Sequence, residues 1–227
     1  MSTASETENM LAEGRIDALS SVTRLTASFA SRTDYVMGRR GVEGKLIVAL
    51  NNGRAPLNDV RVRRALSHAI DRTKYLNIYG PLISVIPIGA HFSPGHPAYV
   101  NLVDRYPYDI AKAKALLAEA KVAPGTVLRL AVPPTDYGRY GSVIVASQLE
   151  AIGLKVEIVL MDWPKWLDEV FKKKNYDMSL IMHVEPMDLG IYARDGYYFN
   201  YNNAAYKKIW AKVRSADTSA ALNQALA

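Results

Sequence analysis

The sequence predicts an α/β fold in which helices flank a mixed, partly parallel sheet. Its second half alternates strand-like and helical segments, with strands expected at residues 127–132, 154–161 and 176–183. Such alternation is typical of parallel strands joined by right-handed helical crossovers. A compact apolar run at 46–50 precedes this unit. With 227 residues, 49% of them apolar, the chain is long enough to bury a core without disulfides, and it contains no cysteine.

Helices and one candidate strand are expected in the first 80 residues. A helical pattern at 6–12 ends at Gly14, and the segment at 15–22 is a candidate short strand. The clearest helix follows Asp59, which suits an N-cap. Its apolar stripe has helical spacing: Val62, Ala65, Leu66, Ala69 and Ile70. Asp71 can cap a second, short helix.

A long loop and four further helices complete the predicted organisation. Residues 81–108 are rich in proline, which blocks long regular elements, so an extended loop is expected there. Asp109 caps the next helix. Helices are also expected at 139–152 and 163–173 and, with a break near Asp217, at 204–227.

Charge and hydropathy exclude several classes of protein. The formal net charge is +6, but the basic residues are spread along the chain and not gathered on one stripe, so we expect no nucleic-acid partner. No segment approaches the roughly 18 apolar residues of a membrane span. The polar, acidic stretch at 1–11 has neither a basic nor an apolar region of a signal peptide.

Three motifs resemble one known family. The first is Asn51 to Arg72, Asn-Asn-Gly-Arg-Ala-Pro-Leu-Asn-Asp-Val-Arg-Val-Arg-Arg-Ala-Leu-Ser-His-Ala-Ile-Asp-Arg, with Leu57 where the family usually has Phe. The others are Tyr-Pro-Tyr-Asp at 106–109 and the helix-to-strand junction at 148–158. Together they resemble family 5 extracytoplasmic solute-binding proteins, which are the oligopeptide-, dipeptide- and nickel-binding components of ABC importers.

The resemblance implies an organisation and a role. Members have two lobes around a ligand cleft, so residues 1–45 are expected to be a remnant of lobe one with the crossover, and 46–227 a C-terminally truncated, periplasmic-binding-protein-like lobe two. The implied protein is no enzyme and needs no cofactor or metal. It captures a peptide or a peptide-sized polar solute for ABC permease subunits, as a monomer, in the periplasm or another extracytoplasmic compartment.

The first expected ligand loop follows the strand at 127–132. In parallel sheets ligands gather at the carboxyl ends of strands. The resemblance implies that a basic residue near the next helix start faces a ligand carboxylate, and Arg139 fits that position. A guanidinium at a helix N-terminus suits an anion. Tyr137 and Tyr140 are candidates for stacking on the ligand or for packing on the loop.

The second expected ligand loop follows the strand that ends at His183. It carries Glu185, Asp188 and Tyr192. Peptide-binding relatives often have Gly-Trp and then an Asp that holds the peptide amino terminus, and Asp188 lies near that place. The Gly-Trp pair is missing, so amines, cations and sugar hydroxyls stay open as ligands. The alternative is a polar loop whose carboxylates cap local backbone.

Other interpretations remain open. His91 and His96 in the long loop could bind a metal, but the neighbouring sequence offers no third ligand. Glu185, Asp188 and His183 could serve a hydrolase as acid and base, although no catalytic motif accompanies them. The helices at 59–79 could form a helix-turn-helix, although their joint lacks the usual glycine turn.

Overall fold

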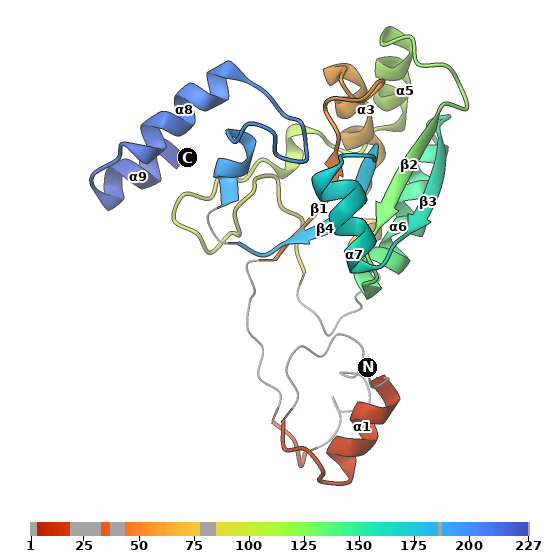
Figure 1. Cartoon of the computed structure of the whole chain (residues 1–227), viewed down its shortest axis with the longest axis vertical. Coiled ribbons are helices and arrows are strands. Elements are labelled where there is room, and N and C mark those ends of the chain that lie inside the picture. The colour runs from red at the N-terminus through yellow and green to blue at the C-terminus, as the bar shows by residue number, and fades with distance from the viewer. Residues whose placement is uncertain (1–3, 19–32, 37–43, 78–84, 186–187, 227) are drawn as a thin grey trace. The chain divides into compact units, whose positions relative to one another are not determined.

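The computed structural model describes residues 4–18, 33–36, 44–77, 85–185 and 188–226 (Figure 1). The chain divides into two compact units, Met1–Gly41 with Leu76–Ile86 and Val42–Tyr75 with Pro87–Ala227. The first unit contains helix α1 (Ala4–Ala12), whose Leu11 carbonyl accepts a 3.1 Å hydrogen bond from the Tyr35 hydroxyl. Residues 15–18 form no strand, so that expectation is wrong for them, and residues 19–22 lie outside the described part.

The described part of the second unit is built on a four-stranded sheet in the order β1-β4-β2-β3. The strands are β1 (Lys45–Leu50), β2 (Val127–Val132), β3 (Lys155–Leu160) and β4 (Met178–His183). Strand β2 is parallel to both β3 and β4, and β1 runs antiparallel to β4. The predicted mixed, partly parallel sheet is therefore confirmed.

The helices follow the sequence pattern closely. They are α3 (Val60–Ala69), α4 (Arg72–Leu76), α5 (Ile110–Glu119), α6 (Asp136–Glu150), α7 (Trp163–Trp166), the π-helical turn η3 (Leu167–Lys172), α8 (Ala204–Arg214) and α9 (Ser219–Leu226), with 3₁₀ turns η2 (Val103–Arg105) and η4 (Asp188–Tyr192). Asp59, Asp71 and Asp109 accept capping hydrogen bonds from backbone amides as expected. Helix α6 begins three residues before the expected 139, because the Thr135 side chain caps it at Gly138 N.

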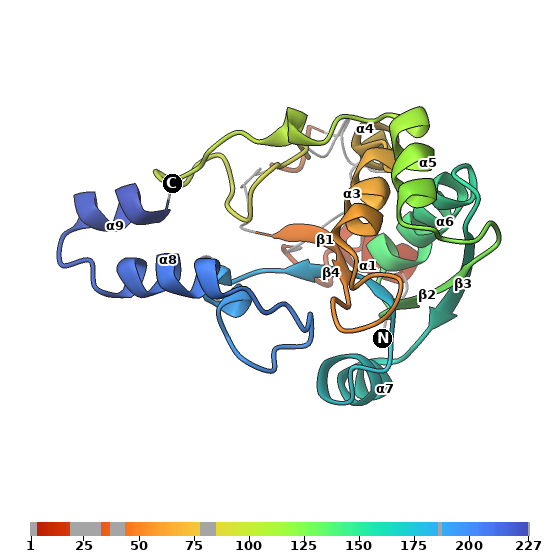
Figure 2. The same cartoon turned by 90° about the horizontal axis from the view of Figure 1, so that it is seen from above.

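Helices cover both faces of the sheet (Figure 2). On one side α6 contacts β2, β3 and β4 and lies beside α3, which packs against α5. On the other side α7 and η3 contribute Trp166 and Val170 to a core with Ala131 of β2 and Ile181 of β4. The Trp166 indole donates to the Ser179 hydroxyl at 3.0 Å, so this buried polar pair is satisfied. None of the helices in the described ranges has the length and apolarity that a membrane crossing requires.

Asn51 joins β1 to the segment that leads into β4. Its side chain is fully buried, and its amide nitrogen donates to the carbonyls of Lys174 and Tyr176, each at 3.0 Å. Its carbonyl oxygen accepts from Gly53 N at 3.1 Å and from the Asn200 amide at 2.8 Å. Buried polar atoms are costly when unpaired, so this one side chain holds three segments together.

Replacing Asn51 with alanine should destabilise the second unit by about 2–3 kcal/mol, because buried carbonyls lose their donors. Urea denaturation followed by fluorescence measures the change. The matched control is Asn58→Ala, at an exposed position in the following turn, where a change within about 0.5 kcal/mol is expected. Equal stability of the two variants would contradict the assigned role of Asn51.

Candidate functional site

A buried lysine stands at the carboxyl end of β4. Lys45 is the first residue of β1 and pairs with His183, the last residue of β4, in the antiparallel register. Its side chain is only 1% exposed. The ammonium donates to the Glu185 carbonyl at 2.6 Å and lies 3.5 Å from Asp188 Oδ1. A charge this deeply buried needs such partners, because desolvation otherwise disfavours it strongly.

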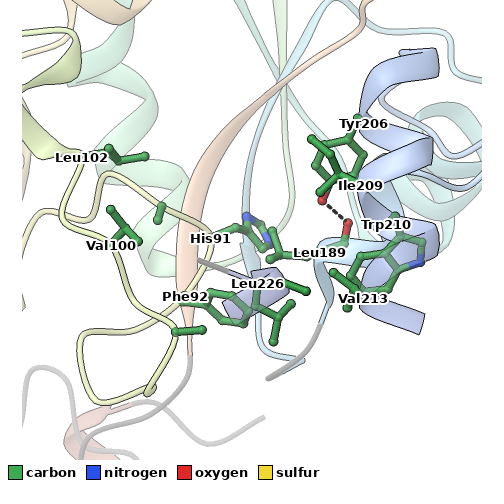
Figure 3. Close-up of a pocket in the computed structure, with 13 residues that line it drawn as sticks. His91, Phe92, Val100, Leu102, Leu189, Tyr206, Ile209, Trp210, Val213 and Leu226 are labelled. Carbon is green, nitrogen blue, oxygen red and sulfur yellow. Dashed lines mark hydrogen bonds between the residues drawn. The ribbon is translucent and has the colours of Figure 1, made fainter. Parts of the chain in front are cut away.

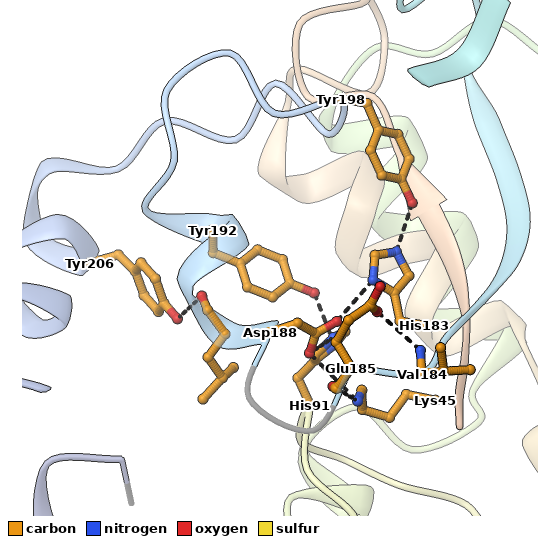
Figure 4. A network of polar contacts seen from close by, with 10 residues as sticks. Lys45, His91, His183, Val184, Glu185, Asp188, Tyr192, Tyr198 and Tyr206 are labelled. Carbon is orange, nitrogen blue, oxygen red and sulfur yellow. Dashed lines mark hydrogen bonds and ion pairs between the residues drawn. The ribbon is translucent and has the colours of Figure 1, made fainter. Parts of the chain in front are cut away.

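Asp188 is the centre of this cluster (Figure 4). It begins η4, and its side chain is 5% exposed. His183 Nδ1 lies 2.9 Å from Asp188 Oδ2, and His91 Nε2 lies 2.8 Å from Asp188 Oδ1. One carboxylate therefore gathers side chains from β1, β4 and the long loop after residue 85.

Opposing effects set the pKa of Asp188. Burial raises it, but the hydrogen bond with His183 and the proximity of His91 and of the Lys45 ammonium outweigh burial. The net result is a pKa well below the usual range of a carboxyl. Asp188 is therefore ionised at neutral pH and acts as an acceptor in the network.

Two tyrosines contact the outer nitrogens of the histidines, which are the ring nitrogens that do not face Asp188. The Tyr192 hydroxyl lies 3.2 Å from His91 Nδ1, and the Tyr198 hydroxyl lies 2.8 Å from His183 Nε2. Burial raises the pKa of both phenols, so both remain protonated. The Tyr198 carbonyl also accepts from the Tyr176 hydroxyl at 2.8 Å, which connects the cluster to the core.

The structure brings together only some of the residues expected to form the site. His183, Asp188 and Tyr192 meet in the buried cluster. The Glu185 side chain is exposed and accepts from Val184 N at 3.2 Å. Only the backbone carbonyl of Glu185 joins the cluster, because it accepts from the Lys45 ammonium.

The remaining expected residues lie at the start of α6. Arg139 and Tyr140 are exposed there. Tyr137 links this helix start to β4, because its hydroxyl accepts from Met182 N at 3.3 Å. The loops after β2 and β4 are therefore neighbours, as expected for parallel strands joined in one sheet.

Lys45 and Tyr198 belong to the cluster but are not among the site residues that the sequence predicts, and His91 is expected only as a possible metal ligand together with His96. Lys45 gave a local signal, since it is a charged residue at the start of an otherwise apolar strand. The sequence pairs His91 with His96 in the same loop, but His96 Nδ1 accepts from the amide of Ala98. The partners of His91 lie about a hundred residues away in the sequence, at Tyr192 and Asp188.

An apolar pocket of about 250 Å³ adjoins the cluster (Figure 3). Its walls come from the loop at 90–102, from Leu189 of η4 and from α8 and α9. The larger lining side chains are Phe92, Leu102, Tyr206, Ile209, Trp210 and Leu226. His91 belongs to both the pocket wall and the Asp188 cluster, so the two features share a border.

The cluster geometry does not favour the hydrolase interpretation. Both ring nitrogens of His183 are engaged, one by Asp188 and the other by Tyr198. The Glu185 carboxylate points to its own backbone neighbour. In the helix-turn-helix interpretation the basic side chains of α3 should be available to nucleic acid, but the exposed Arg61 is held by Asp59 and the Glu119 carbonyl, and Arg63 donates to the Leu57 carbonyl.

Asp188→Asn should destabilise the second unit by about 3–5 kcal/mol, because it leaves the Lys45 ammonium buried without its carboxylate. Urea denaturation monitored by tryptophan fluorescence checks this. Glu185→Gln is the matched control, since it removes an exposed carboxylate of the same loop, and it should change stability by less than about 0.5 kcal/mol. A larger loss in the control than in Asp188→Asn would refute the assignment.

Comparison with known proteins identifies the family of the chain. Residues 1–208 match the family described as bacterial extracellular solute-binding proteins, family 5 Middle. The chain is 34% identical over 138 residues to di/tripeptide-binding protein 2 of Pseudomonas aeruginosa, covering 58% of this chain and 25% of that protein. It is 32% identical over 130 residues to heme-binding protein A of Haemophilus influenzae, covering 51% of this chain and 22% of that protein.

A solved structure has the same fold. The periplasmic binding protein of Helicobacter pylori in complex with the peptide STSA superposes with a TM-score of 0.83 at 18% identity, over 98% of this chain and 46% of that one. The chain thus spans about a quarter of the curated relatives and about half of this solved chain. Because the family match covers most of its residues, the chain belongs to family 5 of the bacterial extracellular solute-binding proteins.

Proposed function

We propose that this chain supplies the ligand-binding lobe of the substrate-binding component of an ABC importer and captures short peptides. The observation that carries the proposal is the family match over residues 1–208. The peptide ligands named for two similar proteins support the choice of substrate class. The component acts outside the cytoplasm as a monomer, and it passes its solute to the permease subunits in the membrane.

The ligand lies against the loops that follow β2 and β4. The start of α6 lies beside the end of β4, since the Tyr137 hydroxyl accepts from Met182 N. In this arrangement Arg139 binds the peptide carboxylate, because it is exposed in the first turn of α6, where backbone amides and the guanidinium both favour an anion. Tyr140, 45% exposed, offers a ring surface beside it.

Asp188 has a supporting role in this proposal. Its two oxygens already face His183, His91 and Lys45, and it is 8% exposed. Binding a ligand ammonium there would require the loss of an existing cationic partner. The exposed Glu185 carboxylate, three residues earlier in the same loop, is the group that meets the peptide amino terminus.

The apolar pocket beside the cluster accommodates a side chain of the peptide. Its volume of about 250 Å³ is below the roughly 300–1,000 Å³ of pockets that enclose a whole small molecule. It therefore suits one apolar group of a larger ligand. Peptides with Leu or Phe should bind more tightly than Gly-Gly, because burying an apolar side chain stabilises a complex by about 1.5–3 kcal/mol.

The first test is thermal unfolding of the chain with di- and tripeptides, heme and neutral oligosaccharides. A ligand that binds only the folded state raises the melting temperature with its concentration. We expect a saturable rise with peptides, larger for those with an apolar side chain. A rise with heme or sugars alone, hydrolysis of the peptides, or no rise at millimolar concentrations would contradict peptide capture by this chain.

The role of Arg139 has its own prediction. Arg139→Ala should weaken peptide binding about tenfold or more, because a charge-assisted hydrogen bond contributes roughly 1.5–3 kcal/mol. Titration calorimetry with the peptide that gives the largest thermal shift measures this change. Arg214→Ala removes an equal charge from the exposed end of α8 and should leave the affinity unchanged. Equal affinities of both variants and the unaltered chain would remove Arg139 from the site.

A further inference from the structure

Two imidazoles and a carboxylate converge in the buried cluster. His91, His183 and Asp188 each offer one donor atom, and these atoms all lie within 4.8 Å of one another. Zinc forms bonds of about 2.0–2.2 Å to such ligands, which puts neighbouring donors of a tetrahedral site roughly 3.4 Å apart. The three atoms therefore lie close enough for small side-chain movements to bring them onto one ion.

The outer nitrogens of both histidines are held in a way that suits metal binding. The Tyr192 hydroxyl lies 3.2 Å from His91 Nδ1, and the Tyr198 hydroxyl lies 2.8 Å from His183 Nε2. A second partner of this kind fixes the ring orientation and determines which nitrogen is left for a metal. In both rings the nitrogen left over is the one that faces Asp188.

The contact between His91 and Asp188 is a second, independent observation that points to a cation in this cluster. Although His91 Nε2 and Asp188 Oδ1 are 2.8 Å apart, neither atom has a hydrogen-bond partner of acceptable geometry among the described residues. Their side chains are 7% and 5% exposed. Buried polar atoms are normally satisfied, and a cation coordinated by both atoms would satisfy them together.

The positive charge of Lys45 determines which further ligand a metal site here requires. Its ammonium is 3.5 Å from Asp188 Oδ1, so the carboxylate charge is already balanced and a divalent ion adds positive charge. Three protein ligands leave a fourth position open on zinc. An anionic group in that position, such as hydroxide or a carboxylate, offsets the added charge.

We propose that His91, His183 and Asp188 form a binding site for a first-row divalent transition metal, with zinc as the reference ion. Imidazole and carboxylate ligands suit zinc, nickel and cobalt, and the protein has no thiolate that would select softer ions. The proposal does not depend on the solute that the protein captures. The bound ion would join the long loop to β4 and η4.

The test is competition for Zn²⁺ between the chain and a chromophoric chelator, with protein that was treated with EDTA and carries no polyhistidine tag. We expect one equivalent of tightly bound Zn²⁺. The chain has four histidines, which supply matched variants. His91→Gln and His183→Gln should weaken binding at least about tenfold, whereas His68→Gln and His96→Gln, outside the cluster, should leave it unchanged.

A second measurement separates ligand loss from unfolding. Tyr192→Phe retains all three ligands, and by removing the outer partner of His91 it should weaken Zn²⁺ binding about 10- to 100-fold with an unchanged circular dichroism spectrum. Bound Co²⁺ should give a visible absorption band that His183→Gln alters. No stoichiometric binding, undiminished binding in His91→Gln, or an equal loss in His68→Gln would each overturn the site and leave a purely structural ion network.

Discussion

The burial of Lys45 next to Asp188 is the constraint on which the arrangement of the chain at the carboxyl end of β4 depends. An ammonium that is 1% exposed requires a nearby anion, and Asp188 at the start of η4 provides it. Because the same carboxylate draws in His183 and His91, the ends of β1 and β4, the long loop and η4 meet at one point. Removing one charge would leave the other buried without compensation.

This network continues into the core beneath the loops proposed to bind the peptide. Tyr198 connects His183 to Tyr176 through hydrogen bonds. Ile181, two residues before His183, lies in the same core as Trp166 of α7. The exposed groups assigned to the peptide lie on this base and outside the buried network. Such a division suits a binding protein, since ligand sites are usually preformed by the structure beneath them.

Local chemistry made much of the fold predictable. Asp59 and Asp109 cap helices through bonds to amides two or three residues away, and the alternating strands follow from hydropathy alone. The buried cluster depends on contacts distant in sequence: Lys45 faces Asp188 across more than a hundred residues, and His91 finds its partners only through the path of the long loop. His183 and Asp188 were predicted as site residues, but their burial and mutual pairing follow from tertiary packing.

The most direct test of peptide capture is an NMR titration of the isotope-labelled 25.1 kDa chain with the peptide that gives the largest thermal shift. The account predicts that backbone amides of residues 135–140 and 185–192 shift together and saturate at one equivalent. Shifts absent from both loops, or spread evenly over the chain without saturation, would contradict a ligand site at the ends of β2 and β4.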